Sequence, residues 1–308
     1  MTRVLTLTLN PTVDVSGDAE VIRPVRKVRT SNGRFDPGGG GINVARVMAK
    51  LGCAVEAVYL AGGEVGQMLD RLLAEQGVAT RRITIEGQTR LGFIVHETST
   101  GLEYRFVPEG PAVPADRLEA VLAAVAAHDG DYVVGSGSLP AGAPEDFYAR
   151  VADAAERRGA RFVLDTSGAA LKATLGRAKV FLAKPSLSEL EQFAGRRLGV
   201  DDAGAVAADI VARGDAELLA VTLGADGAIL ASRDGVTRLP TIPVRVRSAV
   251  GAGDSFIAGM VWTLMEGKDA RDAFRFGIAA GAAAAMTPGT ELCRVEDIAS
   301  LLPRLGPS

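Results

Sequence analysis

Residues 248–265, SAVGAGDSFIAGMVWTLM, join a run of small residues to the start of an apolar helical pattern. Gly251, Ala252 and Gly253 allow the backbone to turn tightly and to approach a ligand closely. The helix that follows leaves its first N–H groups without partners, and the positive end of its dipole points the same way. The stretch therefore predicts an anion-binding site, with phosphate as the commonest occupant.

Asp254 directly follows these small residues, although a carboxylate next to a bound phosphoryl group costs electrostatic energy. Its position makes sense if it removes a proton from a hydroxyl group that attacks the phosphorus. The alternative is an ordinary N-cap aspartate after a glycine turn. The stretch by itself leaves both interpretations open.

Composition narrows the class of protein. The chain has 308 residues, is 47% hydrophobic and carries a net charge of −3, so it can bury the core of one large domain or two. This charge gives no reason to expect nucleic acid or an anionic membrane as a partner. Two cysteines and two histidines are too few for a disulfide framework or a metal site built from them. The absence of a Gly-x4-Gly-Lys-Ser/Thr motif argues against a P-loop enzyme.

The N-terminus alternates like a strand and lacks the apolar core of a signal peptide, and no apolar run reaches the length of a membrane span. We therefore expect a cytoplasmic protein.

Predicted strands and helices alternate along most of the chain. Strands are expected at 4–9, 55–60, 132–135, 161–164, 180–183 and 218–223, with hairpins at 90–107 and around 234–235. Helices are expected at 42–51, 65–76, 115–127, 144–158, 186–194, 202–213 and 252–302. This alternation indicates an α/β protein whose parallel sheet is covered on both faces. Ligands of such sheets bind at the carboxyl ends of the strands, where the polar strand ends fall: Asn10, 135–138, Asp165, Lys184 and 222–224.

Two non-helical stretches interrupt the alternation. Residues 12–36 and 88–110 predict one small β-sheet that projects from the core as a lid. The core would then comprise residues 1–11, 37–87 and 111–308.

Two glycine-rich signatures occur in a characteristic order: GGGGINVA at 38–45 and VGAGDS at 250–255. Together they resemble the two signatures of the ribokinase-like (PfkB) carbohydrate kinases. The resemblance runs nearly end to end, from TLTLNP at 6–11 to PGT at 288–290. Three further features resemble the 6-phosphofructokinases of that family most closely: the four-glycine run, Lys27 followed by Arg29, and YRF at 104–106.

The resemblance implies a fold and an activity. The fold is a three-layer α/β/α core with a mostly parallel central sheet and a small β-sheet lid, through which two copies often form a homodimer. The activity is ATP-dependent phosphorylation of the C1 hydroxyl of fructose 6-phosphate to fructose 1,6-bisphosphate. The implied cofactors are ATP and Mg²⁺, together with a monovalent cation such as K⁺.

The resemblance also implies roles for individual residues. Asp254 matches the general base, and the N–H groups of residues 251–254 match an anion hole for the transferring phosphoryl group. The sugar would be lined by Asp14, Gly38, Gly39 and Asn43. The substrate's own phosphate would be held by Lys27, Arg90, Arg105 and Ser138. The guanidinium fork suits phosphate oxygens; without the resemblance, surface charge on the lid would be the simpler interpretation of Arg90 and Arg105.

On the nucleotide side the resemblance assigns Lys184, Thr222, Gly224 and Gly227. Glu189 matches an acid that organises Mg²⁺ through water, but Ser186 replaces the asparagine usual in the family, and its role stays open. Backbone carbonyls for a monovalent cation would come from Ser248, Val250, Ala284 and Gly289.

Three alternatives remain within this framework. A kinase of the same family could act on tagatose 6-phosphate instead, or it could be a 1-phosphofructokinase. A protein of another class, a sugar-phosphate sensor without activity, could keep the fold, but it would have no use for Asp254.

Overall fold

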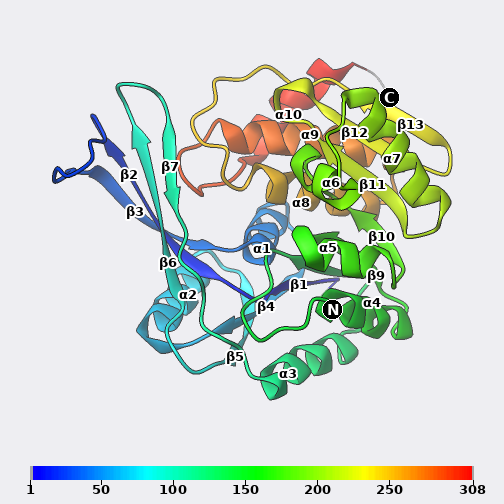
Figure 1. Cartoon of the computed structure of the whole chain (residues 1–308), viewed down its shortest axis with the longest axis horizontal. Helices are drawn as coiled ribbons and strands as arrows, with labels where there is room; N and C mark the ends of the chain where they lie inside the picture. Colours follow the sequence, from blue (N-terminus) through cyan, green and yellow to red (C-terminus); the bar gives the residue numbers. More distant parts are fainter. Residues whose placement is uncertain (1–2, 307–308) are drawn as a thin grey trace.

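The computed structural model describes residues 3–306, which form two β-sheets (Figure 1). The strands of the larger sheet are β1 (Val4–Thr8), β4 (Val55–Ala61), β5 (Ala79–Thr84), β8 (Tyr132–Ser136), β9 (Arg161–Asp165), β10 (Val180–Ala183), β11 (Ala216–Thr222), β12 (Ala228–Ser232) and β13 (Gly235–Leu239). They follow the order β13-β12-β11-β10-β9-β8-β1-β4-β5. Only β12 and β13 pair antiparallel with their neighbours, so the predicted mostly parallel sheet is confirmed.

Helices cover both faces of this sheet. One face packs against α1 (Gly40–Lys50), α2 (Gly63–Glu75), α8 (Ala252–Met265), α9 (Ala270–Ala285) and α10 (Val295–Leu301). The other packs against α3 (Ala115–Ala126), α4 (Phe147–Arg157), α5 (Gly168–Leu175), α6 (Leu187–Ala194) and α7 (Val200–Ala212). Side chains of β1 alternate between the two hydrophobic clusters, with Val4 in one and Leu5 in the other. The three-layer α/β/α architecture is confirmed.

The strand order reverses beside β1. From β1 the chain first adds β4 and β5 on one side, and β8 to β11 then extend the sheet on the other. The connections that leave β1 and β8 therefore diverge and open a crevice at the carboxyl ends of these strands, where ligands bind in open α/β sheets.

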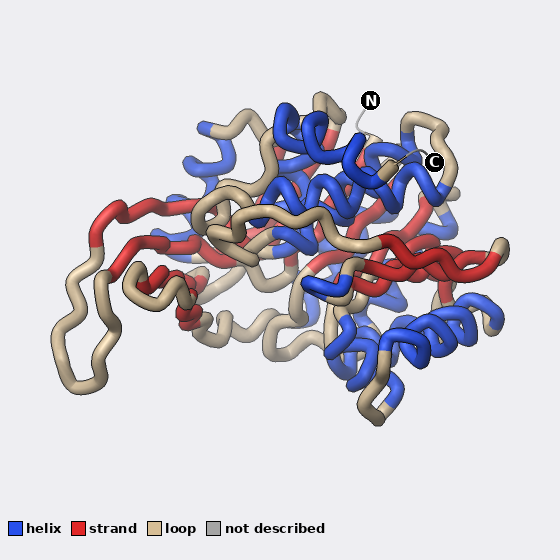
Figure 2. The backbone as a smooth tube through the Cα atoms, turned by 90° about the horizontal axis from the view of Figure 1, so that it is seen from above, coloured by secondary structure: helices blue, strands red, loops and turns tan. Residues whose placement is uncertain are grey.

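The second sheet projects from the core beside this crevice (Figures 1 and 2). It contains β2 (Thr12–Ala19), β3 (Ser31–Gly38), β6 (Arg90–Glu97) and β7 (Glu103–Phe106), in the order β3-β2-β6-β7. Strand β3 continues into the glycine run and so connects the small sheet directly to α1.

Two elements were not predicted from the sequence, and one predicted helix, at 252–302, was wrong. Strand β5 lies at the edge of the sheet and is mostly exposed, so it lacks an alternating pattern. Helix α5 is short and begins with a glycine. The helix predicted at 252–302 is three helices, because Gly267 ends α8 with φ +78° and the Asp269 side chain caps a new helix by accepting from the Asp272 N–H at 2.8 Å.

Every helix within residues 3–306 is too short or too polar to cross a lipid bilayer.

Candidate active site

A cavity of about 310 Å³ lies where the projecting sheet faces the carboxyl ends of the central strands. Its wall contains most of the residues that the sequence assigned to substrate and catalysis. Those that line it are Asp14, Gly39, Asn43, Arg90, Arg105, Ser138, Glu189, Val250, Gly251 and Asp254. They come from strands and helices far apart in the sequence, so the fold brings them together.

The glycine run brings α1 against β1 and β8 more closely than any side chain would allow. A Cβ on Gly41 would lie 2.3 Å from the Leu7 carbonyl oxygen, and one on Gly40 would lie 2.1 Å from Ser136 Oγ. Gly38 packs directly against Asp14, because its Cβ would lie 2.5 Å from Asp14 Oδ2. The run therefore places Asn43, one turn into α1, at the wall of the cavity.

The start of α8 forms the floor of the site. Gly251 has φ +75°, and a Cβ on it would lie 2.3 Å from Leu292 Cδ2, so only glycine fits this turn. The helix begins at Ala252, which puts Asp254 inside the first turn without a capping hydrogen bond. The N-cap interpretation of Asp254 is therefore wrong. The N–H groups of the first turn point out of the helix end, as an anion hole requires.

Asp254 is partly buried and faces both charges and a neutral donor. Its Oδ2 accepts a hydrogen bond of 2.8 Å from Asn43 Nδ2. Burial, and next the charge of Asp165, raise the pKa of Asp254 to about 6, while Asn43 and Lys184 oppose the rise. A carboxylate with this pKa is ionised at neutral pH and still basic enough to take up a proton.

Lys184 supplies a buried cation next to the anion hole. It is 5% exposed, and its Nζ lies 3.1 Å from Asp165 Oδ1. A Cβ on Gly253 would also lie 3.1 Å from that Nζ, so the ammonium group is next to the first turn of α8. Burial lowers the pKa of Lys184, but the carboxylates of Asp165, Glu189 and Asp254 together more than compensate, and the net shift is upward. Lys184 therefore stays charged and attracts phosphate.

Asp14 extends from β2 into the cavity and is 7% exposed. Burial raises its pKa to about 6, and the charges of Arg105 and Arg46 limit the rise. Its ionised form can accept from two adjacent hydroxyl groups, which suits recognition of a sugar.

The predicted phosphate-binding residues differ in what they contact. Arg90 donates to the carbonyl oxygens of Asn10 at 2.7 Å and Pro108 at 3.0 Å, so much of its fork already stabilises the base of the small sheet. Arg105 on β7 is exposed, and its side chain makes no hydrogen bond or ion pair within residues 3–306, which leaves the guanidinium group available for an anion. Ser138 accepts from Asn10 Nδ2 at 3.4 Å.

Lys27 lies outside the cavity wall. It is exposed in the loop that joins β2 to β3 at the outer end of the small sheet. Within a single chain, the structure does not bring Lys27 to the other predicted phosphate-binding residues.

Ser186 positions Glu189. Ser186 Oγ accepts from the Glu189 N–H at 3.3 Å, and Glu189 Oε2 accepts from the Ser186 N–H at 2.7 Å. This reciprocal capping box holds the carboxyl group of Glu189 at the cavity wall. Serine is well suited to an N-cap, which gives this residue a structural role in its own right.

The predicted nucleotide residues do not line the cavity. Thr222 ends β11 and donates its N–H to the Pro185 carbonyl at 3.1 Å, which connects it to the segment that carries Lys184. Gly224 and Gly227 flank the turn that follows, and both have positive φ angles.

Of the predicted carbonyl ligands for a monovalent cation, Ala284 is the least suitable. Its oxygen already accepts from the N–H and from Oγ1 of Thr287, at 3.1 and 2.8 Å. Val250 lines the cavity, whereas Ser248 and Gly289 do not.

Asp165 is the charged residue of the cavity that our assignment of site residues missed. It ends β9, lines the cavity, pairs with Lys184 and accepts from Ser136 Oγ at 3.5 Å. Burial raises its pKa, and Lys184 opposes the rise. Its position as a polar strand end was a usable signal, but its distance from Lys184 cannot be derived from sequence alone. Thr12, Ser136 and Thr166 line the same cavity and were also missed.

Comparison with known proteins identifies the family of the chain. The sequence pattern of the pfkB family carbohydrate kinases matches residues 6–297. The ATP-dependent 6-phosphofructokinase isozyme 2 of Mycobacterium tuberculosis (strain ATCC 25618 / H37Rv) is 42% identical, covering 96% of this chain and 88% of that protein. The protein of the same name from Escherichia coli (strain K12) is 38% identical, covering 96% of this chain and 97% of that protein. A 1-phosphofructokinase from Bacillus subtilis (strain 168) is 33% identical over 98% of both chains.

Solved structures show the same fold. The crystal structure of phosphofructokinase-2 from Escherichia coli in complex with substrates and products has a TM-score of 0.94 at 36% identity, covering 99% of this chain and 100% of that one. Further structures of that protein contain potassium or show a tetrameric inhibited form. Since the family pattern spans nearly the whole chain, and full-length relatives exceed 30% identity, the chain belongs to the pfkB family of carbohydrate kinases.

Proposed function

We propose that this protein is an ATP-dependent 6-phosphofructokinase, which transfers the γ-phosphoryl group of ATP to the C1 hydroxyl of fructose 6-phosphate. The observation that carries the proposal is the position of Asp254, in the first turn of α8 and in the wall of the cavity that contains Asp14 and Arg105. Relatives named 6-phosphofructokinase at 42% and 38% identity support the choice of substrate.

The geometry supports an in-line transfer. Asp254 takes the proton of the C1 hydroxyl as the oxygen forms its bond to the γ-phosphorus, and the bond from that phosphorus to the bridging oxygen breaks to release ADP. The first-turn N–H groups of α8 and the ammonium group of Lys184 bind the charge that develops on the phosphoryl oxygens. Asn43 donates to one oxygen of Asp254 at 2.8 Å, which leaves the other oxygen for the proton.

Mg²⁺ fits the acids of the site. Asp165 and Glu189 both line the cavity, and carboxylates with water and substrate phosphates are the usual ligands of this ion. Within residues 3–306 no cluster of three or more acidic, histidine or cysteine side chains could hold a metal alone, in keeping with an ion that arrives with the nucleotide. Bound there, Mg²⁺ neutralises phosphate charge. A K⁺ ion near the carbonyls of Ser248, Val250 and Gly289 completes the proposed cofactors, supported by the potassium complex of the Escherichia coli protein.

The test is ADP release from the purified protein with MgATP and, separately, fructose 6-phosphate, tagatose 6-phosphate, fructose 1-phosphate and ribose. The highest kcat/KM is expected with fructose 6-phosphate. Preference for fructose 1-phosphate would favour the 1-phosphofructokinase alternative, which the Bacillus subtilis relative keeps open. Saturable binding of a sugar phosphate, with no ADP release in the presence of any of the four compounds, would instead indicate a sensor.

Arg105→Ala is expected to weaken binding of the substrate's phosphate. Loss of a charge-assisted hydrogen bond of about 1.5–3 kcal/mol corresponds to a rise in KM for fructose 6-phosphate of about 10- to 100-fold. The KM for ATP and the melting temperature should stay close to wild type, because the Arg105 side chain is exposed and makes no hydrogen bond or ion pair within residues 3–306. Arg238→Ala, an exposed arginine on β13, is the matched control. Equal KM values in the two variants would exclude Arg105 from the phosphate site.

The small sheet, from residues 12–36 and 88–110, is proposed as a lid that covers the substrate and joins two copies. One row of paired residues across its four strands runs Phe35, Val15, Phe93, Phe106. The three phenylalanines of this row are 52%, 44% and 56% exposed. Asp14 and Arg105 extend from the opposite face into the cavity. Exposed aromatic rows mark contact surfaces. Light scattering is expected to give twice the chain mass of 31.9 kDa; a monomer would contradict this proposal.

We also propose that the protein acts in the cytoplasm, where both of its substrates are metabolites.

A further inference from the structure

Arg46, on the second turn of α1, has so far entered the site only through the effect of its charge on the pKa of Asp14, although only 3% of its surface is exposed. Burying a guanidinium group is costly unless every N–H group finds a partner. Burial lowers the pKa of Arg46 to about 10, so the side chain keeps its charge at neutral pH. Its partners therefore reveal what the buried charge does.

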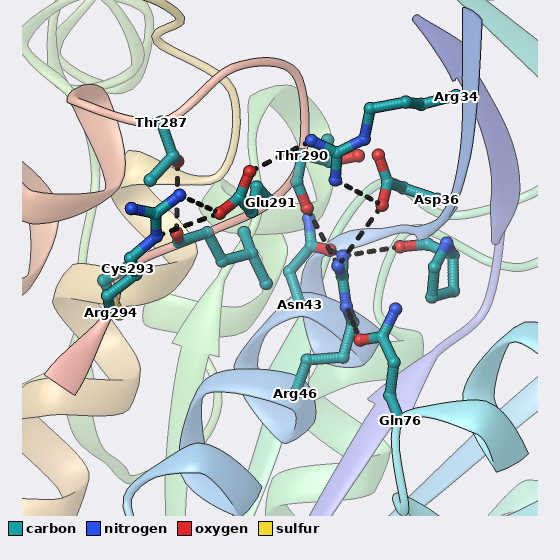
Figure 3. Close-up of polar contacts among 12 residues, drawn as sticks. Arg34, Asp36, Asn43, Arg46, Gln76, Thr287, Thr290, Glu291, Cys293 and Arg294 are labelled. Atoms are coloured by element: carbon teal, nitrogen blue, oxygen red, sulfur yellow. Dashed lines mark hydrogen bonds and ion pairs between the residues drawn. The ribbon is translucent and has the colours of Figure 1, made fainter.

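The guanidinium group contacts five partners from separate parts of the fold (Figure 3). Its Nε donates to Gln76 Oε1 at 2.7 Å, just after α2. One terminal nitrogen donates to the Pro37 carbonyl at 2.8 Å and to Asn43 Oδ1 at 3.1 Å. The other donates to the Thr290 carbonyl at 2.9 Å and forms an ion pair of 3.8 Å with Asp36 Oδ1.

The contact with Asn43 fixes which way the amide of that residue points. A guanidinium group has N–H donors and no acceptor, so the atom of Asn43 that faces Arg46 has to be the oxygen. Nδ2 is thereby left to face Asp254, and it donates to Asp254 Oδ2 at 2.8 Å. In the flipped orientation two oxygens would face each other across that distance. Arg46 thus determines that the proposed base receives a hydrogen-bond donor.

The other contacts of Arg46 hold the guanidinium in place from outside the active site. Asp36 and Pro37 belong to β3, the lid strand that leads into the glycine run. Thr290 belongs to the loop after α9, and Arg34 connects β3 to the same loop by ion pairs with Asp36 at 3.3 Å and Glu291 at 3.0 Å. A lid strand, a loop and the amide of Asn43 therefore meet at one cation.

We infer that Arg46 is a positioning residue for phosphoryl transfer: its guanidinium orients the Asn43 amide toward Asp254 and connects that amide to lid strand β3. The inference rests on the proposed function, because it requires Asp254 to be the base. Arg46 itself touches neither the substrate nor the reacting atoms, and it acts through Asn43.

A double-mutant cycle on kcat tests this pathway. Arg46→Lys keeps a buried cation but cannot reproduce the fixed fork, and loss of the hydrogen bond to Asn43 is expected to lower kcat about 10- to 100-fold while the KM for ATP changes little. In an Asn43→Ala background, the same substitution is expected to cause almost no further loss. Equal losses of kcat in both backgrounds would overturn the inference.

Gln76→Ala is the matched structural control. It removes the Nε contact on the side away from Asn43, and Gln76 is exposed. It is expected to lower the melting temperature slightly and to preserve kcat. If it lowers kcat as much as Arg46→Lys, general loosening of α1 explains the loss, and the inference fails.

Asp254→Asn separates failure of this inference from failure of the proposed function. If Asp254→Asn stays active, Asp254 is not the base, and both the proposed function and the inference are contradicted. If Asp254→Asn is inactive while the kcat losses of Arg46→Lys and Asn43→Ala are additive, only the inference is contradicted. Arg46→Met, which removes the cation, is expected to be less stable than Arg46→Lys, and the cycle does not depend on its folding.

Discussion

Replacing Asp254 by asparagine is expected to lower kcat about 10²- to 10⁴-fold, the usual contribution of a general base. Asparagine has nearly the same shape and can still accept the hydrogen bond from Asn43, but it cannot take up the proton of the attacking hydroxyl. Coupled measurement of ADP release gives kcat and KM for both proteins. Retention of more than about a tenth of the wild-type kcat would show that Asp254 is not the base.

The pH dependence gives this prediction a second readout. The pKa values of Asp254 and Asp14 are both raised to about 6, and both carboxyl groups should be ionised for turnover. For the wild type, kcat/KM should therefore rise steeply as the pH increases through about 6, with the loss of two protons. In Asp254→Asn only Asp14 remains, so the residual kcat/KM should follow a shallower, one-proton rise.

Stability provides the control for Asp254→Asn. A carboxyl group whose pKa is raised by folding destabilises the folded state above that pKa and does not do so below its ordinary pKa. At pH 8 the asparagine variant lacks this cost. Its melting temperature should equal or exceed that of the wild type, which would exclude unfolding as the cause of lost activity.

Replacing Lys184 by methionine is expected to destabilise the protein by about 3–5 kcal/mol, the usual cost of leaving a buried charge without its partner. Lys184 pairs with Asp165 at 3.1 Å, and Asp254 and Glu189 also face it. Urea unfolding measures the change in the free energy of unfolding. Activity should fall about 10²- to 10³-fold, because the cation beside the anion hole is lost.

The destabilisation of Lys184→Met should depend on pH. Lys184 lowers the pKa of Asp165, so its removal raises that pKa further above the ordinary value. The cost of the ionised carboxylate is then largest at high pH and disappears as the pH falls and Asp165 binds a proton. Unfolding at pH 8 and pH 5 measures this difference.

Adding Asp165→Asn to Lys184→Met distinguishes packing from charge. The double variant removes both charges, so much of the lost stability should return, while activity should stay low because neither the cation nor the acid proposed to bind Mg²⁺ is restored. An equally unstable double variant would mean that the Lys184 stem, rather than its charge, supports this region.

The sequence predicted the architecture because the architecture depends on patterns that are local. Strand–helix alternation and two glycine signatures were sufficient for the layers, the second sheet and the position of α8. Strand β5 was not predicted, because an exposed edge strand carries polar residues on both sides. Helix α5 was not predicted, because it is too short for a clear helical period.

The site was predicted as a set of residues, but its contacts were not. Asn43 and Asp254 were both assigned, yet their separation of 211 positions hid the 2.8 Å hydrogen bond between them. An arginine in a predicted helix is expected at the surface, and only the fold shows that Arg46 is buried. Arg90 was assigned to phosphate because its charge is visible in the sequence, whereas the carbonyls that occupy its fork are not.

The small sheet has a consequence for the order in which the chain folds. Its two halves are joined by parallel pairing of β2 with β6, and Thr12 Oγ1 already contacts the Arg90 carbonyl across 78 positions. Closing so long a loop costs entropy that local contacts do not repay. The elements α1, β4 and α2 lie between β2 and β6 in the sequence, so the pairing of β2 with β6 should form after these elements have packed. On unfolding, this pairing should be lost first. The sheet over the cavity can then open and close again while the nine-stranded sheet stays folded.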